Sequence, residues 1–93
     1  MPDQAKKILV VEDEQAMRIS MFEILNHQGY QVSVAENGHM ALEIVHKSPV
    51  DLVISDIRMP EMSGLELLQK LKISSPDLPV VIVTGFASVD TAV

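Results

Sequence analysis

The chain has 93 residues, no cysteine and a formal net charge of −6. Its length allows at most one domain, and the lack of cysteine excludes disulfides and thiolate metal sites. Its seven Lys and Arg residues are scattered along the chain, so we expect no direct binding to nucleic acid. Neither a membrane-spanning apolar run nor a signal-peptide core is visible, so we expect a cytoplasmic protein that does not bind membranes.

The first half of the chain reads as strand, helix, strand and helix. Residues 8–11 form a continuous aliphatic run, which is typical of a strand buried on both faces of a parallel sheet. Apolar residues then recur at helical spacing from Met17, and Gly29 supplies a stop, so we expect a helix whose methionines fill the core. Residues 30–35 predict a second strand, and an Asn-Gly turn precedes a short second helix.

The second half repeats this alternation. Residues 52–54 predict a third strand, Gly64 opens a helix with leucines on one side, and residues 80–83 predict a fourth strand. Strands that alternate with helices of this length favour right-handed crossovers. The pattern therefore predicts an α/β domain built on a doubly wound parallel sheet.

Acidic and hydroxyl side chains follow the predicted strands. Glu12 and Asp13 follow the first strand, Asp56 follows the third and Thr84 follows the fourth. If these strands are neighbours, the side chains converge outside their carboxyl ends, where ligands bind in such sheets. Carboxylates that lie close together repel one another when they are all ionised. A bound Mg²⁺ removes this repulsion, because it takes carboxylate oxygens as ligands and can bind a phosphate oxygen as well. The pattern indicates phosphoryl chemistry, in which a carboxylate can be the nucleophile.

Three segments together resemble one known family. Residues 8–14 read ILVVEDE, residues 51–65 read DLVISDIRMPEMSGL, and residues 79–85 read PVVIVTG. In this order they closely resemble the receiver domain of two-component response regulators, from about residue 6 to residue 93. The resemblance implies a flavodoxin-like sheet of four strands in the order 2-1-3-4, and a role in signal transduction and transcription regulation.

The same resemblance implies a role for each matching residue. Asp56 would accept a phosphoryl group from a histidine kinase, and Mg²⁺ would be held by Glu12, Asp13, Asp56 and the backbone carbonyl of Arg58. Thr84 would be the switch hydroxyl, and phosphorylation would shift the population between two arrangements of an output surface. An output domain is expected in a full-length parent, and the receiver itself is expected to be a phosphoacceptor and not an enzyme.

The chain departs from the family pattern at its C-terminal end. Family receivers continue through a fifth strand, which ends in lysine, and a fifth helix, whereas this chain stops at Val93. We therefore expect residues 1–93 to be a single, incomplete receiver domain. Because the phosphate-binding lysine has no match, we expect impaired phosphorylation and signalling. The fourth strand would also be an exposed edge, so we expect a homodimer or oligomer formed through this edge or through a swapped terminus.

Two other functions remain open at this point. Mg²⁺-dependent phosphohydrolases with an aspartate nucleophile also place an acid after a buried strand, but they usually need a second acid two positions later, where this chain has Arg58. The other alternative is a receiver-like interaction scaffold that takes no phosphate. Mg²⁺-dependent labelling of Asp56 by a small phosphodonor distinguishes these functions.

Overall fold

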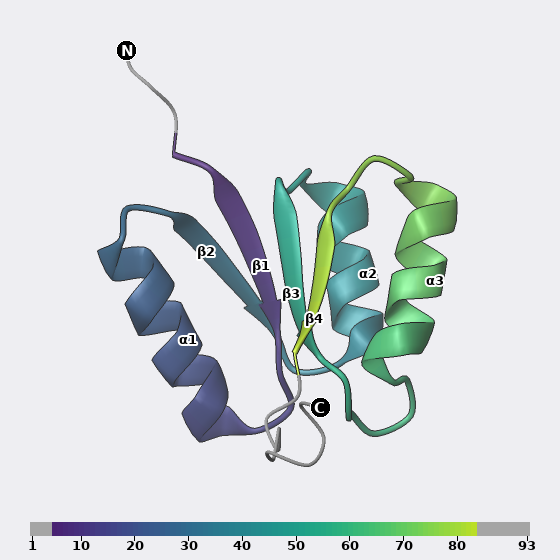
Figure 1. Ribbon diagram of the computed structural model, residues 1–93, viewed down its shortest axis with the longest axis horizontal. Coiled ribbons are helices and arrows are strands. Elements are labelled where there is room, and N and C mark those ends of the chain that lie inside the picture. The colour runs from purple at the N-terminus through teal and green to yellow at the C-terminus, as the bar shows by residue number, and fades with distance from the viewer. Residues whose placement is uncertain (1–4, 84–93) are drawn as a thin grey trace, which may run out of the picture.

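The computed structural model describes residues 5–83 and consists of one parallel sheet with helices on both faces (Figure 1). The strands are β1 (Lys7–Val11), β2 (Gln31–Ala35), β3 (Leu52–Asp56) and β4 (Val80–Val83). The helices are α1 (Gln15–His27), α2 (Gly38–Lys47) and α3 (Gly64–Ser74). The strand order is β2-β1-β3-β4, which confirms the predicted order 2-1-3-4 and the doubly wound α/β fold.

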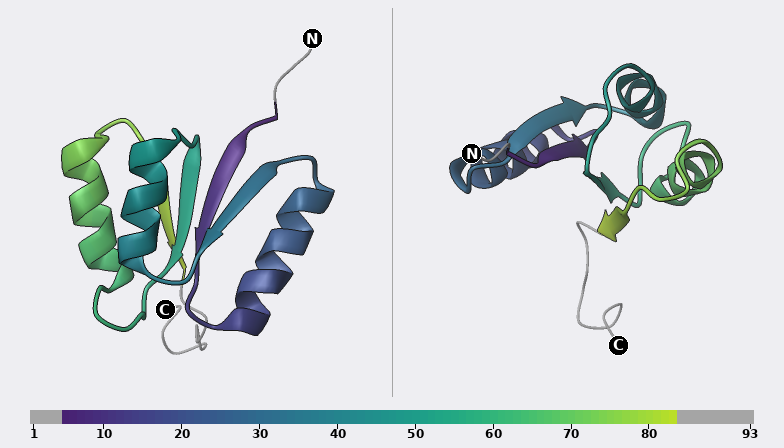
Figure 2. Two further views of the ribbon diagram at one scale, coloured as in Figure 1. Left: turned by 180° about the vertical axis from the view of Figure 1, so that it is seen from behind. Right: turned by 90° about the horizontal axis from the view of Figure 1, so that it is seen from above.

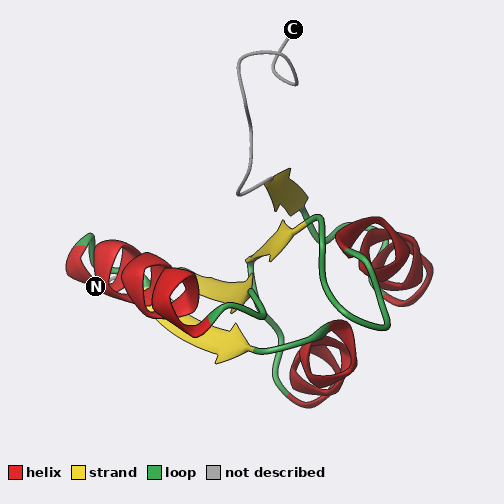
Figure 3. Cartoon of the chain, turned by 90° about the horizontal axis from the view of Figure 1, so that it is seen from below, coloured by secondary structure: helices red, strands yellow, loops and turns green. Residues whose placement is uncertain are grey.

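The helices divide between the two faces of the sheet. α1 covers one face, and α2 and α3 lie side by side on the other (Figures 2 and 3). Alternate residues of β1 therefore enter different layers. Leu9 and Val11 join the main core, which lies between the sheet and the pair α2 and α3. None of the helices among residues 5–83 is long and apolar enough to cross a membrane.

The parallel register aligns the carboxyl ends of the central strands. Val11 pairs with Ser55 across β1 and β3, and Asp56 pairs with Val83 across β3 and β4. The residues that follow β1, end β3 and end β4 therefore lie along one edge of the sheet. This alignment decides which polar side chains can meet.

Each helix begins or ends where the local chemistry predicts. Asn37 caps α2 by accepting a hydrogen bond from the Met40 backbone N–H. Ser63 and Glu66 form a reciprocal capping box at the start of α3. Gly29, two residues beyond the end of α1, is left-handed, with φ of 97°. These caps fix the entry of α2 and α3, which pack over the sheet.

The methionines of α1 do not fill the core as the sequence predicted. Among the described residues no side chain of α1 is buried, and 38% of Met17 is exposed. α1 contacts mainly β1 and β2, and one helix is too narrow to cover a four-stranded sheet. The helical periodicity correctly identified the apolar side of α1, but that side is only partly covered within residues 5–83.

Candidate functional site

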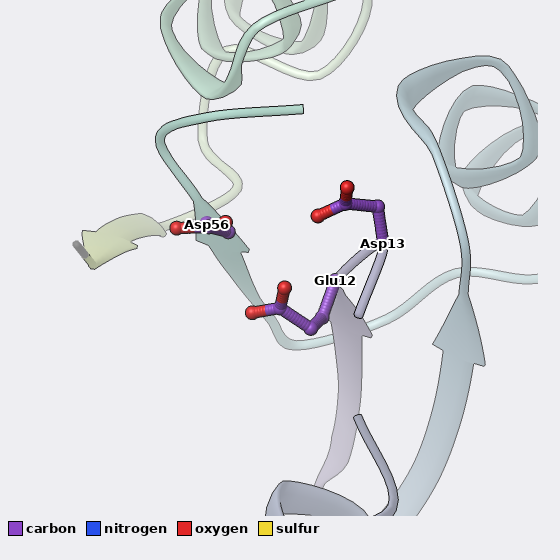
Figure 4. Close-up of side chains that lie close together, drawn as sticks. All are labelled: Glu12, Asp13 and Asp56. Carbon is purple, nitrogen blue, oxygen red and sulfur yellow. The ribbon is translucent and has the colours of Figure 1, made fainter. Parts of the chain in front are cut away.

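Three carboxylates meet at the carboxyl edge of the sheet. Asp56 is the last residue of β3, and Glu12 and Asp13 directly follow β1. One carboxylate oxygen from each lies within 4.8 Å of the others, and the side chains surround a common space (Figure 4). The predicted convergence of these residues is therefore confirmed. It follows from the parallel pairing of β1 with β3, which brings their ends together.

The three carboxylates differ in their exposure to solvent. Glu12 is 5% exposed and Asp56 is 9% exposed, whereas Asp13 lies open to solvent. The backbone N–H of Glu12 donates to the Ala35 carbonyl at 3.0 Å, which ties the residue to the end of β2. Glu12 Oε2 accepts a hydrogen bond from the Glu14 backbone N–H at 3.2 Å. The site thus has an ordered, buried side and an open side.

Burial raises the pKa of Glu12 above its ordinary value, and the nearby charges of Asp56 and Asp13 raise it further. The hydrogen bond from the Glu14 backbone opposes this change. Within residues 5–83 no Lys or Arg side chain forms an ion pair with any of the three carboxylates. No ion pair within the described residues therefore neutralises these carboxylates, and a bound cation would stabilise the site.

The donor set fits a hard divalent cation. All three side chains offer carboxylate oxygens, which Mg²⁺ prefers, and the open side leaves room for water or another oxygen ligand. Opposite ligands of an octahedral Mg²⁺ lie roughly 4 Å apart, since each Mg–O bond is about 2.1 Å. The carboxylates therefore need to move little to become ligands, and Glu12, Asp13 and Asp56 are the residues that could hold the ion.

The loop between β3 and α3 forms the other wall of the site. A shallow hollow lies beside Asp13, lined by Ile57, Arg58, Met59, Pro60 and Ser63. The structure thus brings Arg58 next to Asp13, while metal binding by its carbonyl stays a prediction. The loop is closed by a hydrogen bond from the Gly64 N–H to the Ile57 carbonyl at 2.9 Å. This contact holds α3 against the residue that follows Asp56.

Two neighbours lie against the backbone carbonyl of Asp56, namely the Ser55 hydroxyl and Gly64. The buried Ser55 hydroxyl donates to the Asp56 carbonyl at 2.9 Å. Gly64 approaches that same carbonyl so closely that a Cβ atom on residue 64 would collide with its oxygen. The sequence predicted Gly64 as a backbone device at the start of α3, and the structure adds that it is needed beside Asp56.

Sequence reasoning missed Ser55 and Arg18. Arg18 Nη1 donates to the Glu12 carbonyl at 2.9 Å and lies 3.5 Å from the Asp13 carbonyl. The only sequence signal was a cation in the first turn of the helix that follows the acids. Thr84, the predicted switch hydroxyl, lies outside the described residues. The preceding residue, Val83, pairs with Asp56.

The sequence resembles those of known proteins over nearly its whole length. It matches the response regulator receiver domain family over residues 8–93. It is 40% identical over 85 residues to sporulation initiation phosphotransferase F of Bacillus subtilis, covering 91% of this chain and 68% of that protein. It is 46% identical over 86 residues to the transcriptional regulatory protein ZraR of Klebsiella oxytoca, covering 92% of this chain. The chain spans only about a fifth of ZraR, or 19% of its length.

Solved structures of response regulators also resemble the fold of this chain. The response regulator TrrA of Thermotoga maritima, in complex with Mg²⁺-BeF, matches with a TM-score of 0.84 and 39% identity, over 88% of this chain and 71% of TrrA. TrrA in complex with the histidine kinase ThkA matches with a TM-score of 0.83 and 38% identity, over 90% of this chain and 72% of TrrA.

Proposed function

The chain belongs to the family of response regulator receiver domains, and we propose that it accepts a phosphoryl group on Asp56 from a histidine kinase, with Mg²⁺ as cofactor. The observation that carries the proposal is the meeting of Glu12, Asp13 and Asp56 at the carboxyl edge of the sheet. The TrrA structures support the proposed cofactor and the proposed donor, since one contains Mg²⁺-BeF and another contains a histidine kinase. The proposed location is the cytoplasm, which the cysteine-free sequence supports.

In the proposed reaction a carboxylate oxygen of Asp56 attacks the phosphorus of the donor. An O–P bond forms while the P–N bond to the donor histidine breaks, and the electron pair of that bond goes to the departing imidazole. When bound, Mg²⁺ supplies positive charge to the phosphoryl oxygens and to the crowded carboxylates. The Ser55 hydroxyl bonds to the Asp56 carbonyl and Gly64 lies close against it, which constrains the backbone that carries the nucleophile.

The remaining site residues have supporting roles in this proposal. Glu12, Asp13, Asp56 and the carbonyl of Arg58 bind the ion, and Thr84 provides the hydroxyl that responds to the phosphoryl group. The hollow that contains both Asp13 and Arg58 supports the metal site. For Thr84 the support is the pairing of Val83 with Asp56. Phosphorylation then shifts the population between two arrangements of the output surface of a longer parent.

A small phosphodonor such as acetyl phosphate tests the proposal without a kinase. We expect Mg²⁺-dependent addition of one phosphoryl group, measured by intact mass, and its loss in D56N. D51N is the matched control, because Asp51 precedes β3 and its carboxylate accepts a hydrogen bond from the Lys7 backbone at 2.8 Å. Equal labelling of D56N and wild type would refute Asp56 as the acceptor.

The same assay separates the two alternative functions. A receiver-like scaffold would take no label, and a phosphohydrolase would release phosphate from esters over many turnovers. We propose that the protein is not an enzyme of that kind, because Arg58 occupies the position of the second acid that such hydrolases usually need.

We also propose that this chain associates with itself through β4 or a swapped terminus. Among residues 5–83, β4 pairs with β3 on one side only, and 45% of Val81 is exposed on this edge strand. Unpaired apolar edge strands favour pairing with another chain. Sedimentation at micromolar concentration should show a dimer or oligomer, and V81K should shift it toward monomer. A stable wild-type monomer would contradict this proposal.

A further inference from the structure

The Arg18 side chain contacts two of the three residues that connect β1 to α1. Its Nη1 atom donates to the Glu12 carbonyl at 2.9 Å and lies 3.5 Å from the Asp13 carbonyl. Its backbone N–H donates to the carbonyl of Glu14, the N-cap, at 3.0 Å, which is the ordinary first hydrogen bond of the helix. One residue of the first turn of α1 thus reaches back over the segment that carries two of the three site carboxylates.

The connecting segment has few other supports. The Glu12 N–H bonds to the Ala35 carbonyl at 3.0 Å, and the Glu14 N–H bonds to the Glu12 carboxylate at 3.2 Å. Glu14, the N-cap of α1, makes no side-chain capping bond, in contrast to the N-caps of α2 and α3. No side-chain cap therefore holds the start of α1, and the Arg18 guanidinium bonds to the carbonyls that precede it.

The guanidinium contacts carbonyls and forms no ion pair with a carboxylate among residues 5–83. An arginine paired with Glu12 or Asp13 would compete with a metal ion for the same oxygens. A guanidinium bonded to their carbonyls instead constrains the backbone and leaves both carboxylates available. Both contacts come from the single Nη1 atom, whose two N–H groups can serve two neighbouring acceptors.

We propose that Arg18 is a positioning residue that holds the backbone of Glu12 and Asp13 so that both carboxylates face the space beside Asp56. Its effect on Mg²⁺ binding rests on the proposed function, whereas its hold on the backbone does not. Arg18 touches neither the phosphoryl donor nor the ion in this role. It acts on the site through the conformation of the residues that bind the ion.

Hydrogen exchange without any divalent cation tests the hold on the backbone. The variant R18M keeps an unbranched side chain and removes the donors, and K70M removes the same charge from an exposed position on α3. We expect the amides of Glu12 and Glu14 to exchange about tenfold faster in R18M and unchanged in K70M. Unchanged rates in R18M would overturn the proposal. An equally faster exchange of the Leu9 and Val53 amides in R18M would also overturn it, because that result indicates general destabilisation of the fold.

Calorimetric titration with Mg²⁺ tests the consequence for the site. We expect the Kd of R18M to rise about tenfold while that of K70M stays at the wild-type value, a size typical for residues that orient metal ligands. Equal weakening in both variants would show a general charge effect and overturn the positioning role. A wild-type protein that binds no Mg²⁺ would refute the proposed cofactor, and hydrogen exchange would still decide the role of Arg18.

A second variant covers the case in which R18M does not fold. R18K keeps the charge, but its ammonium is one bond closer to the backbone than Nη1 and reaches the carbonyls less well, so Glu12 and Glu14 should exchange about threefold faster than in the wild type. Wild-type exchange rates in R18K, with R18M unfolded, would overturn the proposal and assign Arg18 a general role in stability.

Discussion

Replacing Gly64 with alanine should damage the site through the backbone of Asp56. The added Cβ would collide with the Asp56 carbonyl oxygen and would lie 3.0 Å from Ile57 Cα and 3.1 Å from the Asp56 carbonyl carbon. These obstacles are backbone atoms, so no side chain can rotate away. Overpacking costs about 1–3 kcal/mol, and we take the upper value here. Alanine returns at most about 1 kcal/mol through helix propensity, so we predict a net loss of about 2 kcal/mol in the free energy of unfolding.

G29A is a control that should lose a similar free energy of unfolding at a position outside the carboxylate site. Gly29 has φ of 97° and nothing within 4 Å of a built Cβ, so G29A suffers only the strain of a left-handed alanine, about 1–2 kcal/mol. Urea denaturation followed by far-UV circular dichroism measures both losses. Mg²⁺ titration should then separate the variants, because only G64A displaces Asp56. Wild-type stability of G64A, or equal Mg²⁺ affinity of G64A and G29A, would refute this reasoning.

Three further predictions concern charge, core and cap. The folded protein raises the pKa of Glu12 above its unfolded value of 4.5, so the proton-linked stability is complete below 4.5 and is lost as the pH rises through the folded pKa. E12Q should therefore raise the Tm of the metal-free protein at neutral pH and flatten its pH dependence; a lower Tm would contradict the sign. L67A empties a fully buried core position and should lower the free energy of unfolding by about 2–5 kcal/mol. I73A, at a site 83% exposed, should lower it by at most about 0.5 kcal/mol. Similar losses for both variants in urea denaturation would argue against the described core. S63A removes the capping hydroxyl of α3 and should lower the free energy of unfolding by about 1 kcal/mol in the same assay. An unchanged free energy of unfolding would argue against the capping box.

The strands and the meeting of the carboxylates could be predicted because they depend on local pattern and on a general property of parallel sheets. Aliphatic runs such as residues 8–11 mark buried strands, and the carboxyl ends of neighbouring parallel strands share an edge. Once β1 and β3 are neighbours, Glu12, Asp13 and Asp56 have to meet. The strand order itself came from the resemblance, since alternation alone leaves several orders possible.

The contacts that refine the site could not be predicted, because they depend on side-chain direction and close approach. A long arginine on a helix surface has many accessible rotamers, and only the fold shows that Arg18 turns back to the Glu12 carbonyl. The collision that excludes alanine at residue 64 likewise depends on how the β3–α3 loop closes. The exposure of Met17 has a related cause: periodicity identifies the apolar side of a helix but not what covers it.

Chemical trapping of the acyl phosphate is the most direct test of the proposed phosphoacceptor. After incubation with acetyl phosphate and Mg²⁺, borohydride reduces an aspartyl phosphate to homoserine, and peptide mass spectrometry locates the changed residue. We predict homoserine at position 56, dependent on Mg²⁺ and absent when the donor is omitted. Homoserine at Asp13 or Asp51 in place of Asp56, or no reduced residue in a protein that binds Mg²⁺, would contradict the assignment of Asp56 as the phosphoacceptor.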